Sequence, residues 1–141
     1  METYVFKEEI RNAYERLPHA LAIYQFIDNQ IIAKVVSDGY CELFGFENQA
    51  QAYEALGKNV YHNIHPEDIC RIETEAYRSL MAGDTYDIIY RSRTKGLNDK
   101  VDYRAMHAIG KHLEMDGVHL VHVWYTQKAL FVQSSLVDTT I

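Results

Sequence analysis

The sequence predicts one α+β domain: a five-stranded antiparallel sheet with short helices on one face, preceded by an amphipathic helix. Three observations lead to this prediction. Two extended segments follow the first helical pattern, residues 38–82 are helical in character, and three strand-like runs joined by short loops come last. The chain of 141 residues is near the usual size of one domain and can bury its own core.

The N-terminal helix is predicted over residues 4–17, with Thr3 as its N-cap and Pro18 at its end. Its apolar residues recur at the spacing of one helix face and form a stripe, which must pack on another surface. This stripe is the candidate interface of a homodimer, formed through the helix and the outer face of the sheet. The candidate interface residues are Phe6, Ile10, Tyr14 and Leu17.

A β-hairpin is predicted from residues 20–27 and 30–37, because Asp28 and Asn29 between them favour a turn. Both segments are apolar on both faces, so both faces of this hairpin need cover. The helix over residues 4–17 could supply one of the two covers.

Three helices are predicted between residues 38 and 82, each with its own start or stop signal. The first is capped by Asp38 and ends at Gly45, the second covers residues 49–56 and ends at Gly57, and the third opens with His65-Pro66-Glu67-Asp68 and ends at Gly83. Proline at the first helical position, followed by two acids, suits a helix start.

Three strands are predicted in the last third of the chain, over residues 86–93, 101–109 and 118–126. Turn residues at 95–99 and 115–117 separate them. Residues 128–141 are predicted to be an exit segment or linker to an effector, and the sequence leaves open whether it is a helix, a strand or neither.

Composition excludes several classes of protein. The net charge of −6 lacks the basic footprint of a nucleic-acid-binding protein. No apolar stretch is long enough to span a bilayer, so no membrane contact is expected within the chain. The N-terminus lacks the pattern of a secretory leader, and the two cysteines form no CxxC pair, so a cytoplasmic location is expected.

Local motifs indicate a family. Residues 36–46, VSDGYCELFGF, are similar to the PAS signature in which a strand passes into a helix that ends in Leu-Phe-Gly-aromatic. Residues 65–68, His-Pro-Glu-Asp, are similar to the start of the long PAS helix, and Tyr90-Arg91 and Gly110 fit the later strands. The chain therefore resembles a PAS domain over residues 18–127, with a flanking helix over residues 1–17.

The resemblance implies a sensory module of the kind found upstream of diguanylate cyclases, histidine kinases or transcription regulators. Such modules bind small molecules or pair with other domains, and an N-terminal helix outside the sheet often helps them to dimerise. The sequence departs from the family at its exit, because Tyr125-Thr126-Gln127-Lys128 lacks the aspartate of the usual Asp-x-Thr element. This departure concerns the contact that passes the signal onward rather than the fold.

A candidate ligand cavity is predicted between the helices and the later strands, where small Ala105 among larger residues would leave space. The alternative is that the same side chains fill a core at normal density. The candidate lining residues are Tyr40, Phe44, Ile64, Ile69, Ile72, Ala76, Ile88, Tyr90, Tyr103 and Ala105.

Other chemistry has little support in the sequence. His62 and His65 alone do not complete a zinc site, so no metal site is expected, and the simpler interpretation has His65 fix a helix start while His62 is solvated. His119 and His122 should lie on opposite faces of a strand. No motif indicates haem or the flavin-reactive cysteine of some PAS domains, so the identity of any cofactor stays open.

No catalytic residue is assigned, because none of the known nucleophile, metal or phosphate motifs is present. The preferred hypothesis is a sensor that binds a small ligand non-covalently, or dimerises, or does both, to control an attached effector. The alternative is a ligand-free protein–protein interaction module, and a small α+β-barrel enzyme is the third hypothesis.

Overall fold

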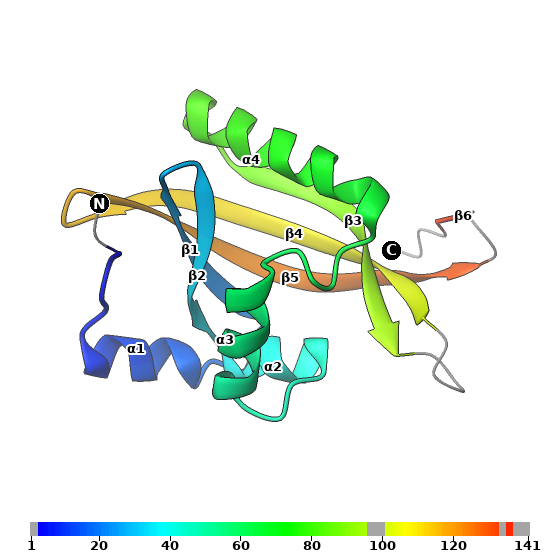
Figure 1. The fold of residues 1–141 in the computed structure, drawn as a ribbon, viewed down its shortest axis with the longest axis horizontal. Helices are drawn as coiled ribbons and strands as arrows, with labels where there is room; N and C mark the ends of the chain where they lie inside the picture. The colour runs from blue at the N-terminus through cyan, green and yellow to red at the C-terminus, as the bar shows by residue number, and fades with distance from the viewer. Residues whose placement is uncertain (1–2, 96–100, 133–134, 137–141) are drawn as a thin grey trace. The chain divides into compact units, whose positions relative to one another are not determined.

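The computed structural model describes residues 3–95, 101–132 and 135–136. Its strands form one sheet in the order β2-β1-β5-β4-β3, with a short strand, β6, paired to β5 (Figure 1). The strands are β1 (Leu21–Ile27), β2 (Gln30–Val36), β3 (Tyr86–Lys95), β4 (Val101–Met115), β5 (Val118–Val132) and β6 (Ser135–Leu136). The predicted α+β class with a five-stranded antiparallel sheet is confirmed, and β6 is an addition to it.

The chain divides into two compact units. The first unit consists of Met1–His62 and Gly110–Trp124, and the second consists of Asn63–Ile109 and Tyr125–Ile141. Strands β4 and β5 each contribute residues to both units.

The β1–β2 hairpin of the first unit forms where the sequence predicts it. Asp28 and Asn29 have φ angles of 49° and 61°. Positive φ at both central positions is the conformation of a two-residue turn that matches the twist of paired strands. On its other side β1 pairs antiparallel with β5, with Ile23 opposite His122 and Leu21 opposite Trp124.

The N-terminal helix is shorter than predicted. Helix α1 covers Glu8–Glu15, and residues 3–7 are not helical. The Tyr4 backbone N–H donates to Oε1 of the buried Gln25 side chain at 2.7 Å, and Phe6 is buried in a cluster on the sheet. These contacts with distant residues hold the segment extended, so Thr3 does not cap a helix.

Helix α2 (Asp38–Phe44) is capped one residue earlier than predicted. Ser37, not Asp38, is the N-cap, since its Oγ accepts the Tyr40 N–H at 3.1 Å. The same hydroxyl accepts the Leu21 N–H at 2.9 Å and donates to the His19 carbonyl at 2.6 Å. The helix ends at Gly45, with φ of 79°, as predicted.

Helix α3 (Gln49–Lys58) runs past the predicted stop at Gly57 and is capped by the Asn48 side chain. In the second unit, a 3-10 turn over Pro66–Asp68 leads into α4 (Ile69–Ala82), which ends at Gly83 and packs along β3 (Figure 1). His65 Nδ1 accepts the Glu67 N–H at 3.1 Å, which confirms that His65 fixes this helix start.

Strands β4 and β5 are longer than predicted. They are joined at Asp116 and Gly117, whose φ angles of 52° and 77° confirm the predicted turn. Strand β5 continues to Val132 and then pairs with β6, so the predicted exit segment contains strand structure. The predicted turn at residues 95–99 lies largely outside the described residues.

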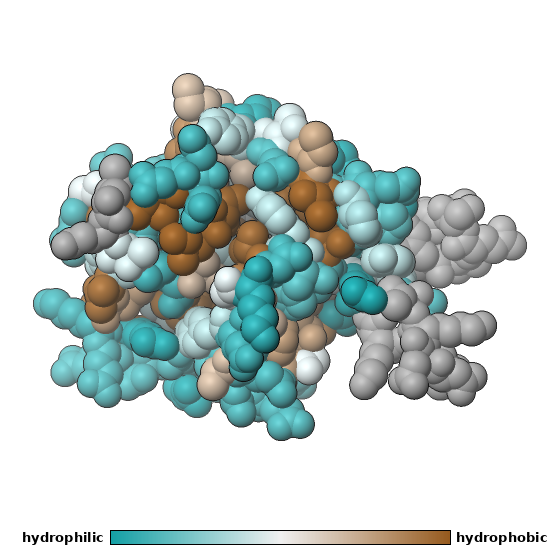
Figure 2. Space-filling view, viewed as in Figure 1, coloured by the Kyte–Doolittle hydropathy of each residue, from teal (hydrophilic) through white to brown (hydrophobic). Residues whose placement is uncertain are grey.

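Apolar groups are visible among hydrophilic ones in the space-filling view (Figure 2). Among the residues whose side chains are described, the exposed large apolar ones are Val5, Ile10, Tyr77, Met81, Ile109 and Trp124. Within the described ranges, none of the helices is both long enough and apolar enough to cross a membrane.

Candidate functional site

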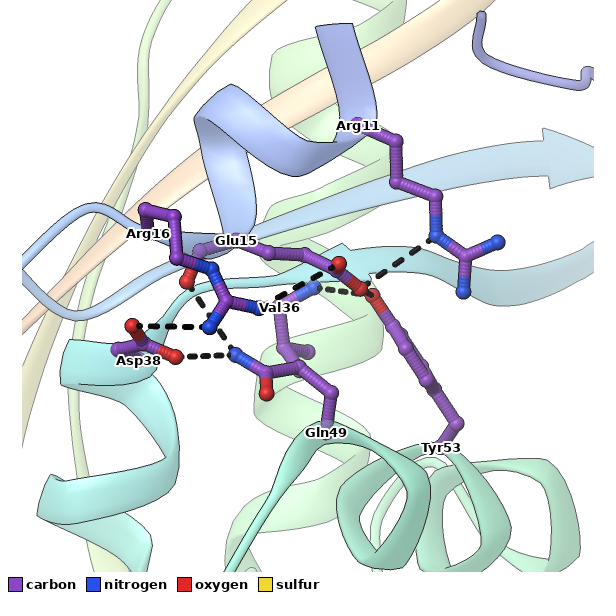
Figure 3. A network of polar contacts seen from close by, with 7 residues as sticks. All are labelled: Arg11, Glu15, Arg16, Val36, Asp38, Gln49 and Tyr53. Carbon is purple, nitrogen blue, oxygen red and sulfur yellow. Dashed lines mark hydrogen bonds and ion pairs between the residues drawn. The ribbon is translucent and has the colours of Figure 1, made fainter. Parts of the chain in front are cut away.

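A polar network connects helix α1 to α3 and to strand β2 within the first unit (Figure 3). The Tyr53 hydroxyl on α3 donates to Glu15 Oε2 at 2.8 Å and accepts the Val36 backbone N–H at 3.1 Å. Glu15 is buried on α1, and Val36 ends the edge strand β2. One phenol therefore links the helix to the sheet.

Further contacts surround this link (Figure 3). Arg11 lies 3.4 Å from Glu15 Oε2, and its guanidinium carbon lies 5.2 Å from the Tyr53 ring centroid. Gln49 Nε2 donates to Asp38 Oδ1 at 2.6 Å and to the Glu15 carbonyl at 3.2 Å. Charge, ring stacking and hydrogen bonds therefore all favour the docked position of α1.

The electrostatic state of Tyr53 is fixed by its surroundings. Burial raises its pKa to about 12, and the hydrogen bond to Glu15 adds to the rise against the opposing contact with Val36. The hydroxyl therefore stays protonated at neutral pH and can donate to the carboxylate.

The outer face of the sheet is defined here as the face of β1 and β5 that carries Ile23, Leu120, His122 and Trp124. Residues directly opposite one another on paired strands share a face, which the β1–β5 register shows for these positions. The N-terminal segment covers part of this face, because Phe6 packs in one cluster with Ile23 and Leu120.

His122 lies under the N-terminal segment on the outer face. Its ring centroid is 5.5 Å from Tyr14 and 6.1 Å from Trp124, both in edge-on geometry. Its Nε2 is buried and has no hydrogen-bond partner among the described residues. Burial lowers the pKa of His122 and favours the neutral ring.

The four candidate interface residues do not form one helical stripe. Phe6 lies outside α1 and is only 7% exposed, so its ring belongs to the chain's own core. Tyr14 and Leu17 are half-buried, and Ile10 is 39% exposed. Trp124, which sequence reasoning missed, is 41% exposed on the outer face. Its place between Val123 and Tyr125 in a strand-like run gave no sign of this exposure.

The opposite face of the first unit carries a histidine pair that the sequence did not reveal. His112 Nδ1 and His119 Nε2 are 2.8 Å apart, and both rings lie against Phe26. The β4–β5 turn brings these two residues together. His119 and His122 thus contact different surroundings, as their spacing predicts.

The second unit holds most of the predicted cavity residues. Ile72, Ala76, Ile88, Tyr90 and Ala105 are buried, whereas Ile64, Ile69 and Tyr103 are half-buried. Tyr40, buried, and Phe44, half-buried, belong to the first unit, where their rings are 4.5 Å apart. The cavity itself stays a prediction.

Strand alternation divides the predicted lining. His107 Nε2 contacts Asp87 Oδ1 at 2.6 Å, so these two side chains share one face of β3 and β4. Tyr103 and Ala105 lie on that face with His107, whereas Ile88 and Tyr90 point to the other. The expectation that all four face one space therefore needs correction, because the register of the two strands cannot be read from the sequence.

Ser92 is a further buried polar residue of the second unit. It shares the face of Ile88 and Tyr90 by alternation and is 0% exposed. Its Oγ has no hydrogen-bond partner among the described residues. A buried hydroxyl without a partner is uncommon in folded proteins.

Asp68 and Arg91 join the start of α4 to β3. Asp68 Oδ2 accepts from Arg91 Nε at 3.0 Å and from the Arg91 backbone N–H at 2.8 Å, and Oδ1 accepts from Nη2 at 2.7 Å. Burial opposes ionisation of Asp68, but the contacts with Arg91 outweigh it and lower the pKa of the carboxyl. This contact gives a physical reason for an aspartate at position 68, two residues after Pro66.

Side chains of the types that bind metals do not form a metal site among the residues that the structure describes. Within the described part of the chain, no three histidine, cysteine, aspartate or glutamate residues are grouped to hold a metal ion. His62 is half-buried beside Phe46, at 5.7 Å between ring centroids, instead of solvated as expected. Cys41 is buried, which raises the pKa of its thiol, and Cys70 is exposed.

Comparisons with known proteins place the fold. No protein-family model and no curated protein matches the sequence. A PAS domain from Colwellia psychrerythraea matches with a TM-score of 0.59 at 14% identity, over 86% of this chain and 96% of that one. A sensory box histidine kinase/response regulator from Burkholderia thailandensis matches with a TM-score of 0.53 at 19% identity, over 85% and 84%.

The light-oxygen-voltage protein of Rhodobacter sphaeroides is also similar, with a TM-score of 0.59 at 12% identity, over 85% of this chain and 65% of that one. These identities are low, so the likeness defines the fold alone. The chain has the fold of PAS and light-oxygen-voltage domains, as the sequence motifs predict.

Proposed function

We propose that this chain is the regulatory PAS module of a signalling protein and pairs with a second copy through the outer face of its sheet. The observation that carries this proposal is the exposed Trp124 ring on the outer face, next to His122, whose ring lies against Tyr14 of α1. Tryptophan is enriched among the residues that dominate binding at protein interfaces. Ile10 and Val5 add exposed apolar surface in the same unit.

The proposal connects pairing with control of an attached effector. Helix α1 lies at the N-terminal end of the fold, and the polar network around Tyr53 and Glu15 holds it in position. A change in this docking alters the surface next to Trp124. Such a coupling suits a module that passes a signal by changing how two copies pair.

Replacing Trp124 with lysine tests the interface. We expect light scattering to give the mass of two chains for wild-type protein and the mass of one chain for the Trp124→Lys variant, because a charge replaces the apolar centre of the contact. The Ile10→Glu variant should also shift the measured mass from two chains toward one. Phe6 is unsuitable for this test, since its replacement would damage the core.

Met81→Lys is the matched control. Met81 is 79% exposed on α4 of the second unit and is not among the residues that define the outer face, so its replacement changes exposed apolar area and charge on a different element. It should leave a two-chain mass. An unchanged two-chain mass in Trp124→Lys, with circular dichroism like that of wild type, contradicts the interface.

A small-molecule ligand in the second unit is the second candidate function, favoured by the buried Ser92 hydroxyl. Native mass spectrometry of wild-type protein should then show excess mass for each chain, and Ser92→Ala should lose it, because the hydroxyl supplies a polar contact. Ser79→Ala is the control, since the buried Ser79 Oγ already donates to the Ala76 carbonyl at 3.1 Å.

A filled core gives the opposite pattern. Wild-type protein then carries no excess mass, and Ser92→Ala raises the free energy of unfolding by about 1 kcal/mol because it removes an unsatisfied buried hydroxyl. That result favours the ligand-free interaction module over the ligand-binding sensor.

A further inference from the structure

His122 differs from the other titratable groups of the first unit because its surroundings do not stabilise a positive charge on the ring. Its Nε2 is buried without a hydrogen-bond partner in the described residues. The Tyr14 ring of α1 lies 5.5 Å away and the Trp124 ring 6.1 Å away. A protonated imidazole donates from both nitrogens, so its second N–H would have no acceptor here.

The charged groups around His122 do not compensate for a proton. Strand β1 presents Leu21, Ile23 and Gln25 on the outer face, none of them charged. On the neighbouring strand β4, Lys111 shares the face of Leu113, which packs against the Phe6 cluster, and a lysine there opposes a second positive charge.

The charges of α1 are engaged elsewhere or exposed. Near Tyr14, Glu15 contacts Arg11 and Tyr53, and Arg16 lies 3.7 Å from Asp38 and 3.8 Å from Glu15. Glu8 and Glu9 are exposed in the first turn. Burial is the dominant influence on His122 and lowers its pKa.

We propose that His122 makes the docking of the N-terminal segment depend on protons. The neutral imidazole fits beneath Tyr14, whereas the imidazolium needs water and is accommodated when residues 3–15 leave the outer face. Acidification therefore favours the undocked segment and exposes the surface around Trp124. For its consequence in signalling, this inference rests on the proposed pairing through that surface.

The direction follows from proton linkage. Above the ordinary histidine pKa of about 6.5 the ring is neutral in both states, and docking has its full strength. Below that pH the undocked state binds the proton first, because the docked state has the lowered pKa. The ratio of undocked to docked molecules then rises by at most about tenfold per pH unit for one proton.

Amide hydrogen exchange over Glu8–Glu15 measures this docking. In wild-type protein, protection of these amides, corrected for intrinsic exchange, should fall by up to about tenfold per pH unit below pH ~6.5. The amides of β1 should stay protected, which separates local undocking from global unfolding. Protection of α1 that does not change with pH overturns the proposal.

The His122→Phe variant keeps a ring under Tyr14 but cannot take up a proton. We expect its α1 protection to be independent of pH over the same range. His119→Phe is the control: it removes a half-buried histidine on the opposite face, whose pKa burial also lowers, and it should retain the wild-type pH dependence. A pH dependence that persists in His122→Phe overturns the proposal.

A titration of the wild-type ring keeps the test valid if His122→Phe does not fold. The NMR signals of His122 should titrate below the ordinary histidine pKa, together with the loss of α1 protection. An ordinary midpoint with α1 still protected contradicts the proposal. Light scattering on the same samples reports the copy number, so failure of pairing and failure of proton-linked docking are distinguished.

Discussion

Replacing Gly39 with alanine is expected to lower the free energy of unfolding by about 3 kcal/mol, the upper end of the usual cost of overpacking. A Cβ at this position would overlap the backbone carbonyl oxygens of Pro18 and His19 and the carbonyl carbon of His19. Backbone atoms cannot rotate away as a flexible side chain can. The midpoint of urea unfolding measures the effect.

The surroundings of Gly39 leave little freedom to relax. Its N–H donates to the Leu17 carbonyl at 3.1 Å, and the neighbouring Ser37 hydroxyl donates to the His19 carbonyl at 2.6 Å. Moving α2 outward to make room would break both bonds. This close approach of α2 to residues 17–19 is the physical reason for glycine in the DGYCELF stretch.

Gly57→Ala is the matched control. Gly57 lies inside α3, and a Cβ there would meet nothing within 4 Å. Alanine is favoured over glycine in a helix interior, so this variant should gain about 0.5–1 kcal/mol. Equal unfolding midpoints for the two variants would contradict the packing described for Gly39.

Asp68→Ala is the second replacement with a large expected effect, a loss of about 3 kcal/mol in the free energy of unfolding. The Asp68 side chain is 5% exposed, and its carboxylate accepts three hydrogen bonds from Arg91. Without it, the backbone N–H, Nε and Nη2 of Arg91 lose the acceptor that Asp68 provides. Thermal or urea unfolding measures the loss.

Glu67→Ala is the control for that prediction. Glu67 also lies near Arg91, at 3.6 Å, but its side chain is 71% exposed. Ion pairs in water contribute little, so this change should cost less than about 1 kcal/mol. If Glu67→Ala and Asp68→Ala were equally destabilising, burial would not be what makes the Asp68 contact strong.

The pH dependence of the Asp68 contribution has a defined sign. The pKa of Asp68 is lowered in the folded protein, so its contribution is present above the ordinary aspartate pKa of about 3.9. It is lost as the pH falls below that value through the lowered pKa. The difference in unfolding midpoint between wild type and Asp68→Ala should therefore shrink in acid.

Local signals in the sequence predict the elements whose ends depend on neighbouring residues. The glycine at 45 and the His65-Pro66 start of the long helix act within one turn of chain, so composition is enough to locate them. The same holds for the turn at Asp28 and Asn29, where positive φ suits those residue types.

Elements set by distant contacts could not be predicted in this way. The start of α1 depends on the bond from Tyr4 to Gln25 and on burial of Phe6, partners that pattern analysis does not connect. The proximity of His112 to His119 depends on the β4–β5 turn. The division of Tyr103 and Ala105 from Ile88 and Tyr90 depends on strand register.

The native mass spectrum of the unmodified protein tests the central claim most directly, because it counts the chains in each complex. The account predicts a complex of two chains at micromolar concentration, which dissociates to one chain in Trp124→Lys. A wild-type spectrum with single chains at every concentration would contradict pairing through the outer face.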